Sequence, residues 1–366
     1  MDDAVYQDRV SRALENPRDH YCYRIFFLLF CSTGLTIGDV LRVGFYGFGA
    51  IGRLAVRLAL KRGYEVVGVV DIDKNILGKD VGDVLGVGSI GVKITSDISS
   101  LMGADVAIHA TGSYLDRVFD QIASIARLGV DVVSTCETLS YPYYRYPVLG
   151  TRLDEIAKRY GVAIIGAGIN PGFLFDTLVV TIAASQPAVK KIRVIRSLDA
   201  AKRREPFRKK VGVGEDPVVF GEKLARGEVT GHVGYAESIY LVALAGDLNL
   251  TRVVEAQKPV IAEDSVESHG VRVEKGRNRG VIGYGSGYVG DEEIIRVEFH
   301  AYVGAPEYEE ISIEGEDTGI VWRSSGTHGD LGTVSVVLNV AERIHTLPPG
   351  LNLITELLPF KIRFQR

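Results

Sequence analysis

The sequence predicts an α/β protein in two parts: a doubly wound parallel sheet, followed by an α+β domain built on an open sheet. Short apolar strands alternate with amphipathic helices between residues 42 and 165, which is the pattern of βαβ units. After about residue 170, long β-branched stretches follow one another instead. The length of 366 residues leaves room for roughly two domains.

The first part of the chain alternates strictly between predicted strands and helices. Residues 42–46 form a short apolar strand, 51–61 a helix with one apolar face, and 65–70 a strand of nearly continuous valine. Valine-rich strands of this kind suit a parallel sheet that is covered on both faces. The alternation continues with strands at 105–109, 131–134 and 162–165 and with helices at 115–128 and 153–160.

The second part begins at Asn170–Pro171, where proline suits the first turn of a helix. Between residues 294 and 302, Arg296, Glu298 and His300 alternate with apolar residues. This alternation predicts an antiparallel sheet with one solvated face. Further strands are expected at 191–195, 252–254, 280–282 and 309–314, and helices at 235–244 and at 331–344, the last returning to the first domain.

These patterns divide the chain into four segments. Residues 41–170 form the first domain, 171–329 a second domain for substrate binding and dimerisation, and 330–366 a C-terminal helix and tail. Residues 1–40 resemble neither domain, because no clean hydrophobic period runs through them. They are either an N-terminal extension or the product of an over-extended reading frame whose true start is Leu41.

Composition and charge exclude several classes of protein. Apolar residues make up 46% of the chain and charged residues 24%, which is typical of a globular protein and not of a disordered chain. The 42 basic and 46 acidic residues give a net charge of −4. Because there is no basic excess to neutralise phosphates, nucleic acid is not expected as a main partner.

Cysteine usage and hydropathy indicate the compartment. Cys22, Cys31 and Cys136 are too few for a disulfide framework or a CxxC metal cluster, so a reduced, cytoplasmic protein is expected. No apolar run approaches the roughly 18 residues of a membrane span, so no membrane association is expected. Asparagine, glutamine and methionine are scarce, with only 2 methionines, a composition that hints at a heat-adapted source.

A GxGxxG pattern occurs three times, but only one copy has the surroundings of a dinucleotide-binding loop. Gly47, Gly49 and Gly52 follow a predicted strand and open a predicted helix, whereas the copies at 86–91 and 285–290 are expected to be turns. In such a loop the first glycine permits the tight turn, the second lets the backbone approach the pyrophosphate, and the third lets helix and strand lie close together.

The residues around this loop complete a Rossmann nucleotide-binding pattern. Ala50 and Ile51 open the helix whose N-terminal N–H groups would face the phosphates. Asp71 ends the next strand, where a carboxylate binds the ribose hydroxyls. Asp71 favours NAD, and the nearby Lys74 leaves NADP open, so the sequence predicts NAD or NADP as the cofactor.

Two small-residue loops at strand ends are expected near the nicotinamide, because ligands of open α/β sheets bind beyond the carboxyl ends of the strands. Thr111 and Gly112 follow one strand, and Asn170 lies in the loop 166–172 after another. Small side chains let such loops pass close to the nicotinamide ribose and ring. Ordinary turn chemistry is the alternative interpretation.

Glu137 is the one carboxylate in these strand-end loops. A carboxylate there is able to act as general base or to hold an ammonium, and a capping or surface role is the alternative. Cys136 is expected to be a buried thiol and not a nucleophile, because no histidine adjoins it. Tyr141, Tyr143 and Tyr144 follow at once and are expected to wall a substrate pocket.

His232 lies in a Gly-His-Val-Gly segment before a predicted helix, and we assign it to the substrate pocket. His109 lies in a predicted buried strand and is expected to be a core residue. No histidine has a partner at metal-ligand spacing, so no metal site is expected. The basic run at 203–210 is expected to be a solvated turn or a clamp on an anionic cofactor or a partner subunit.

A family resemblance rests on the segments 44–86, 135–142, 168–173, 196–210, 231–238 and 329–357. They resemble 2,4-diaminopentanoate dehydrogenases and the related native amine dehydrogenases, whose fold is similar to that of dihydrodipicolinate reductase. The resemblance implies that the glutamate of Thr-Cys-Glu, here Glu137, is catalytic, and that the protein is a homodimer or larger. The paired histidines and Pro-Ser-Gly-Thr motif of dihydrodipicolinate reductases are absent, which argues against that activity.

Together these observations predict an NAD(P)-dependent oxidoreductase that acts on the CH–NH2 group of a small amine or diamine. Glu137 would deprotonate the ammonium and later activate water. Two alternatives stay open: a reductase of a cyclic imine, in the manner of dihydrodipicolinate reductase, and an NAD(P)-binding regulator without turnover.

Overall fold

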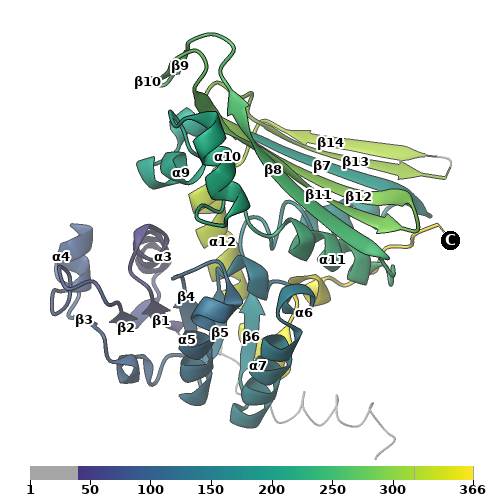
Figure 1. The fold of residues 1–366 in the computed structure, drawn as a ribbon. Helices are drawn as coiled ribbons and strands as arrows, with labels where there is room; N and C mark the ends of the chain where they lie inside the picture. The colour runs from purple at the N-terminus through teal and green to yellow at the C-terminus, as the bar shows by residue number, and fades with distance from the viewer. Residues whose placement is uncertain (1–39, 317, 366) are drawn as a thin grey trace, which may run out of the picture. The chain divides into compact units, whose positions relative to one another are not determined.

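The computed structural model describes residues 40–316 and 318–365, so the expectations for residues 1–39 lie outside the described residues. The chain divides into the units Met1–Leu41 and Arg42–Arg366. The second unit contains two large sheets with their helices (Figure 1). In both described ranges, no helix has the length and apolar character needed to cross a bilayer.

The first large sheet has seven strands, all paired in parallel. They are β1 (Arg42–Tyr46), β2 (Glu65–Val70), β3 (Ile94–Thr95), β4 (Val106–His109), β5 (Asp131–Ser134), β6 (Ala163–Gly166) and β15 (Gly350–Asn352). Their order, β15-β6-β5-β4-β1-β2-β3, reverses between β1 and β4. That reversal is the switch point beside which doubly wound sheets bind ligands.

The helices of this part are α3 (Ala50–Lys61), α4 (Val81–Leu85), α5 (Leu115–Arg127), α6 (Pro142–Arg145) and α7 (Pro147–Tyr160), with 3-10 turns at Ile98–Leu101 and Glu137–Leu139. Helix α5 shows why the pattern was readable: Leu115, Val118 and Ile122 recur at helical spacing and are all buried. The predicted strands and the helices at 51–61 and 115–128 are therefore confirmed to within one residue, whereas α7 begins six residues before the predicted 153–160. The glycines at 86–91 form a turn with positive φ.

The second large sheet has six strands in the order β14-β13-β7-β12-β11-β8. They are β7 (Val189–Asp199), β8 (Arg252–Ile261), β11 (Asn278–Val289), β12 (Glu292–Tyr302), β13 (Tyr308–Gly315) and β14 (Gly319–Ser324); β9 (Val266–Ser268) and β10 (Val271–Val273) form a separate hairpin. The predicted open sheet is confirmed, but it is mixed and not purely antiparallel. Strands β7 and β12 pair in parallel because the long segment between them returns β12 in the same direction.

The helices of this second part are α8 (Thr177–Ala183), α9 (Glu205–Lys210), α10 (Pro217–Ala225), α11 (Tyr235–Ala245) and α12 (Gly329–Ala341), with 3-10 turns at Ala200–Lys202, Ile344–Thr346 and Ile354–Leu357. Helix α12 packs against α3, β4 and β5, and β15 adds a strand to the first sheet. The C-terminal segment therefore returns to the first part of the chain, as predicted, with a strand as well as a helix.

The structure corrects the expectation that the GxGxxG copy at 285–290 is a turn. Gly285 and Gly287 are not in a turn but inside β11, on the face that α11 covers. A Cβ at Gly285 would lie 2.7 Å from the Cβ of Tyr235, and one at Gly287 would lie 2.7 Å from a methyl group of Ile239. These glycines bring helix and sheet close together, and only the last glycine, Gly290, lies in the turn.

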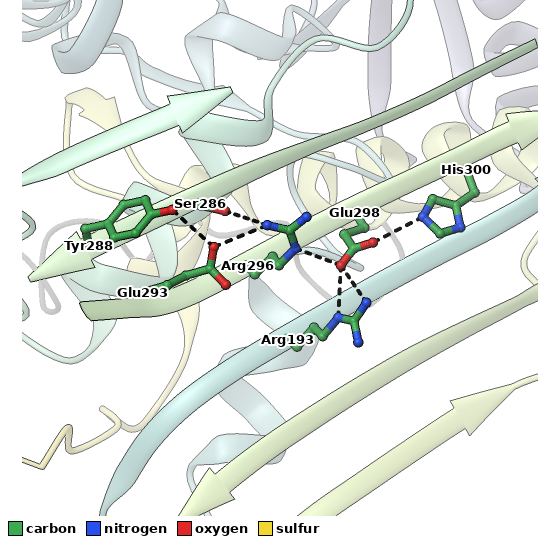
Figure 2. Close-up of polar contacts among 7 residues, drawn as sticks. All are labelled: Arg193, Ser286, Tyr288, Glu293, Arg296, Glu298 and His300. Carbon is green, nitrogen blue, oxygen red and sulfur yellow. Dashed lines mark hydrogen bonds and ion pairs between the residues drawn. The ribbon is translucent and has the colours of Figure 1, made fainter. Parts of the chain in front are cut away.

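The two faces of the second sheet differ in polarity, as the alternation predicted. Ile295, Val297 and Phe299 of β12 are buried in the core with α8 and α11. The other face of β12 carries a polar network (Figure 2), in which Glu298 binds Arg193, Arg296 and His300. These hydrogen bonds, first of all the one from His300, hold the pKa of Glu298 down at about 2.

The segment after β6 corrects a second expectation. Pro171 does not open a helix: the Asn170–Pro171 peptide is cis and Gly172 has a φ of +121°, which a right-handed helix cannot contain. Helix α8 begins at Thr177, where the Asp176 carboxylate accepts a 2.7 Å hydrogen bond from the Thr177 N–H. The residues between form a turn that directs the Asn170 side chain toward His232.

Candidate active site

The loop between β1 and α3 uses each of its three glycines for a different steric reason. Gly47 has a φ of +100°, and a Cβ there would lie 2.6 Å from the Ala110 carbonyl oxygen. A Cβ at Gly52 would lie only 1.9 Å from the Gly47 carbonyl oxygen, so helix and turn touch there. Gly49 is exposed, and no atom of the described residues lies within 4 Å of its Cβ position. The space beside Gly49 is thus open to a ligand.

The start of α3 is suited to phosphates. Its N-cap, Gly49, provides no side-chain hydrogen bond to the helix, so the first N–H groups, including those of Ala50 and Ile51, keep their capacity for a ligand. The Asp71 carboxylate accepts hydrogen bonds from the N–H groups of Phe48 (2.6 Å) and Asp73 (2.8 Å). Asp71 is therefore fixed beside the loop, with lone pairs left for ribose hydroxyls. These residues fit a nicotinamide dinucleotide.

A pocket of about 410 Å³ lies next to this loop. Six of the predicted site residues line it: Ile51, Thr111, Gly112, Glu137, Asn170 and His232. They come from the carboxyl ends of several parallel strands and from the segment before α11. The structure thus brings the cofactor loop, the two small-residue loops and the candidate base to one cavity, although the role of each residue stays a prediction.

Glu137 lies in the 3-10 turn that follows β5. Its side chain is partly buried, and a Cβ at Gly234 would lie 3.6 Å from the Glu137 Cβ. Within the described part of the chain, its carboxylate accepts no hydrogen bond and forms no ion pair. A carboxylate that lines a cavity without a protein partner is available to a ligand, whereas a capping carboxylate is not.

Two neighbouring groups are buried and do not titrate near neutral pH. Burial raises the pKa of the Cys136 thiol to about 12, as expected for a packed thiol and not a nucleophile. Burial lowers the pKa of His109 to about 4. The His109 ring contacts the Ser134 hydroxyl (2.8 Å) and the Gln121 amide (2.9 Å), so it is the core residue that its strand predicted.

Asn170 and His232 form the polar floor of the pocket. Their side chains meet at 3.2 Å, Asn170 Nδ2 to His232 Nε2, and Arg196 donates to Asn170 Oδ1. The His232 ring contacts the rings of Phe299 and Tyr235, with centroid distances of 4.6 and 4.7 Å. Burial lowers the pKa of His232 well below its usual value, so the imidazole is neutral at pH 7.

The three predicted pocket tyrosines are not part of the pocket lining. Tyr141 stacks on Tyr240 of α11 at 5.1 Å, Tyr144 lies 5.0 Å from the same ring, and Tyr143 meets Tyr141 edge-on. They attach α6 to α11, together with Arg145, which binds the buried Glu237 at 2.6 Å. Their assignment to the substrate pocket stays a prediction, because closeness to Glu137 in sequence does not fix the direction of a side chain.

Several lining residues were not predicted. Arg196, Leu198 and Phe299 come from the second sheet, and Gly329 and Asp330 from the start of α12. The only sequence signal was the basic run, of which Arg203, Arg204 and Lys210 do line the pocket. Across residues 40–316 and 318–365, no group of three or more histidine, cysteine, aspartate or glutamate residues could hold a metal ion.

Two family models match the chain. Residues 173–362 match the 2,4-diaminopentanoate dehydrogenase C-terminal domain, which is more than half of the chain. The chain belongs to the 2,4-diaminopentanoate dehydrogenase family. Residues 41–136 match the N-terminus of dihydrodipicolinate reductase. The predicted resemblance is therefore confirmed, and the chain is an oxidoreductase of this dehydrogenase family with NAD or NADP as its cofactor.

Individual relatives agree with the family. The chain is 28% identical over 340 residues to 2,4-diaminopentanoate dehydrogenase from Acetoanaerobium sticklandii, covering 87% of this chain and 94% of the relative. Its 51% identity to 4-hydroxy-tetrahydrodipicolinate reductase from Archaeoglobus fulgidus covers only 23% of this chain and 31% of that protein. Amine dehydrogenase from Mycobacterium smegmatis has the same fold, with a TM-score of 0.76, 23% identity, and coverage of 90% and 99%.

Proposed function

We propose that this member of the 2,4-diaminopentanoate dehydrogenase family oxidises the CH–NH2 carbon of a small primary amine, and catalyses the reverse amination. The observation that carries the proposal is the Glu137 carboxylate in the cavity beside the cofactor loop, which has no partner among the residues that the structure describes. Ile51 and Thr111 line the same cavity, so an amine there would lie near both the carboxylate and the bound nicotinamide.

The cofactor would be held by the residues of the loop. The start of α3 at Ala50 and Ile51 would bind the pyrophosphate, and Asp71 the ribose next to the adenine. When bound, the oxidised nicotinamide supplies an acceptor for a hydride. The open space at Gly49 and the orientation of Asp71 by two backbone N–H groups support this assignment.

Glu137 would perform the proton transfers. A primary amine arrives as an ammonium and cannot release hydride in that form, so Glu137 first takes one of its protons. Glu137 then releases this proton to solvent and is a base again. After oxidation, the carbon is an electrophilic iminium, and Glu137 takes a proton from the attacking water as the C–O bond forms. Glu137 passes that proton to the amino nitrogen, which leaves as ammonia as the C–N bond breaks, and the hydroxyl proton returns to Glu137 as the carbonyl forms. His232 stays neutral beside these steps and adds no charge that would repel the ammonium.

Replacement of Glu137 by glutamine tests this role. Glu137→Gln keeps the shape of the side chain and removes the base, so turnover should fall by about 10²–10⁴-fold while cofactor affinity stays the same. Amine-dependent reduction of NAD(P)⁺ and a cofactor titration on the same preparation measure both quantities. Glu222→Gln is the matched control, because Glu222 is an exposed carboxylate on α10.

Undiminished turnover of Glu137→Gln would refute the mechanism, and loss of cofactor binding would indicate that Glu137 has a structural role instead.

The two alternative functions predict different experimental results. A regulator would bind NAD(P) without amine-dependent turnover. A cyclic imine reductase would reduce imines but oxidise no primary amine; its support is the match of residues 41–136 to the N-terminus of dihydrodipicolinate reductase.

We further propose that the protein assembles as a homodimer through the open face of the second sheet, opposite α8 and α11. Around the network of Figure 2, this face carries arginine–tyrosine stacks, such as Arg296 over Tyr284 at 4.3 Å, and the exposed Val254 and Val321. Sedimentation at micromolar concentration tests this, and a monomer at that concentration would refute the proposal.

The cytoplasmic location, the heat-adapted source and the lack of a nucleic-acid partner stay predictions from composition.

A further inference from the structure

Two strand-end loops of the first sheet meet in the wall of the pocket. Ser113, in the loop after β4, lines the cavity, and so do Thr135 and Glu137 after β5. The pairing of β4 with β5 ends at His109 and Ser134, followed by a backbone hydrogen bond of 2.9 Å from the Thr135 N–H to the His109 carbonyl. Beyond this point the two loops leave the sheet, so their separation depends on the contacts between them.

Glu137 belongs to a 3-10 turn of three residues, Glu137–Leu139. Backbone hydrogen bonds close the turn, from the Leu139 N–H to the Cys136 carbonyl at 3.0 Å and from the Ser140 N–H to the Glu137 carbonyl at 3.2 Å. Among the residues that the structure describes, none donates a hydrogen bond to the Glu137 carboxylate. The place of this carboxylate therefore depends on how the turn is attached to the rest of the protein.

Thr138, the residue after Glu137, makes the first attachment. Its side chain is buried, and its hydroxyl accepts a hydrogen bond of 2.8 Å from the Leu115 N–H and donates one of 3.1 Å to the Ser113 carbonyl. Leu115 is the first residue of α5, where a backbone N–H has no partner inside its own helix. The Thr138 hydroxyl thus acts as a cap for α5 and ties the turn to the loop 111–115.

Ser134 and His109 make a second attachment, on the strand side of the same turn. The Ser134 hydroxyl accepts a hydrogen bond of 3.1 Å from the Cys136 N–H and donates one of 2.8 Å to His109 Nδ1. The other ring nitrogen, Nε2, lies 2.9 Å from Gln121 Oε1 and 2.8 Å from Thr111 Oγ1. Because the amide oxygen is an acceptor, Nε2 carries the ring hydrogen and Nδ1 accepts. Burial lowers the pKa of His109 to about 4, so this arrangement persists at neutral pH.

Both attachments lie behind the wall of the pocket and end in the loop 111–115. The side chains of Thr138, Ser134 and His109 are buried and do not line the cavity. A buried polar network specifies one arrangement more strictly than apolar packing does, because a displaced member leaves its partners without hydrogen bonds. The network therefore limits how far the turn with Glu137 can move relative to the loop that is expected to face the nicotinamide.

We propose that Thr138 and Ser134 are positioning residues, whose hydroxyls hold the Glu137 carboxylate at a fixed place relative to the loop 111–115. The proposal rests on the amine dehydrogenase function argued above and adds how its base is kept in place. Proton transfer requires groups within hydrogen-bond reach, and a displacement of about 1 Å costs about 10²-fold in rate. Removal of either hydroxyl should therefore slow the chemical step and leave binding of amine and cofactor nearly unchanged.

Thr138→Val tests the first attachment, because it keeps the shape of the side chain and removes the hydroxyl. The assay uses NAD(P)⁺ and the more reactive of two small primary amines, 2-aminopentane and 4-aminopentanoate. We expect kcat to fall by about 10- to 100-fold, with little change in KM for the amine or Kd for the cofactor. Thr138→Ser keeps the hydroxyl and should keep most of the rate. Thr181→Val is the matched control: the Thr181 hydroxyl also donates to a backbone carbonyl, at 2.7 Å, but Thr181 is exposed and does not line the pocket.

A double-mutant comparison separates positioning from a merely structural role. If Thr138 acts through Glu137, then Thr138→Val should cause no further loss of kcat in Glu137→Gln, because the base is already absent. Equal losses in both backgrounds, an unchanged kcat of Thr138→Val, or weaker cofactor binding would overturn the proposal. Ser134→Ala should show the same dependence on Glu137, and it decides the question if Thr138→Val does not fold.

A crystal structure of Thr138→Val with NAD⁺ separates this proposal from the proposed function. If the unaltered protein oxidises neither amine, the dehydrogenase function fails. A turn at Glu137 that is displaced by about 1 Å from the loop 111–115 would still support the positioning role. A turn in its original place would refute that role.

Discussion

Replacement of Gly49 by valine should separate cofactor binding from folding. Gly49 has a φ of −71° and a ψ of −161°, an extended conformation that any residue adopts. No atom lies within 4 Å of its Cβ position, so the protein has room for the new side chain. That side chain would occupy the space at the start of α3 where the pyrophosphate must approach.

The magnitudes follow from these two facts. Hydrogen bonds to charged groups contribute about 1.5–3 kcal/mol each, and displacement of the pyrophosphate by one side chain should break one or two. At about 1.4 kcal/mol per tenfold, the Kd for NAD(P)⁺ should rise by about 10- to 10⁴-fold. The loss of glycine at an N-cap costs the helix about 1 kcal/mol, so the melting temperature should fall by only about 2–4 °C.

Calorimetric titration with NAD⁺ and NADP⁺, together with thermal unfolding, measures both effects. Gly52→Ala is the matched control with the opposite expectation, because its Cβ would lie 1.9 Å from the Gly47 carbonyl oxygen. That variant should lose stability first and binding as a consequence. Unchanged affinity in a well-folded Gly49→Val would refute the assignment of this loop to the pyrophosphate.

Three further outcomes are expected. Asp71→Ala should weaken binding of NAD⁺ more than that of NADP⁺ in the same titration, because the Asp71 carboxylate is proposed to accept hydrogen bonds from the ribose hydroxyls and would repel a 2′-phosphate. Equal effects on both cofactors would mean that Asp71 does not contact the ribose. His109 has a folded-state pKa of about 4 against 6.5 when unfolded, so the unfolded chain binds more protons between these values. Stability should fall by about 3 kcal/mol as pH drops from 6.5 to 4, and His109→Gln should flatten that part of the profile in pH-dependent thermal unfolding. Removal of residues 1–40 should leave amine-dependent activity and melting temperature unchanged, and a less stable or inactive product would contradict the placement of every functional element after Leu41.

The parts of the fold that the sequence predicted are those fixed by local chemistry. The strand–loop–helix unit around Gly47 and Gly52 was predictable from the sequence. The contacts that require glycine at these two positions lie within a few residues or in the loop that follows the neighbouring strand β4. The buried stripe of α5 was readable because a helix repeats its face every three to four residues. The position of Glu137 at the pocket was predictable for a related reason, since the carboxyl ends of parallel strands lie at one edge of the sheet.

The errors occurred where local chemistry was ambiguous. Pro171 is compatible both with a helix start and with the turn that the structure contains, and only the positive φ of Gly172 excludes the helix. Gly285 and Gly287 were assigned to a turn because glycine is common there. Their actual role depends on Tyr235 and Ile239, which lie about 50 residues earlier in the chain and leave no local signal.

The same distinction separates the two walls of the active site. The position of the wall that contains Glu137 follows from the order of the parallel strands. The position of the other wall depends on a strand pairing between distant segments: β7 and β12 pair in parallel, so that Arg196 lies opposite Phe299, and both residues line the pocket. No pattern within either strand predicts that pairing. If the first wall performs the proton transfers and the second selects the substrate, then Glu137→Gln should reduce turnover of every amine, while changes at Phe299 should only change which amines are preferred. Loss of all activity from both walls alike would contradict this division of roles.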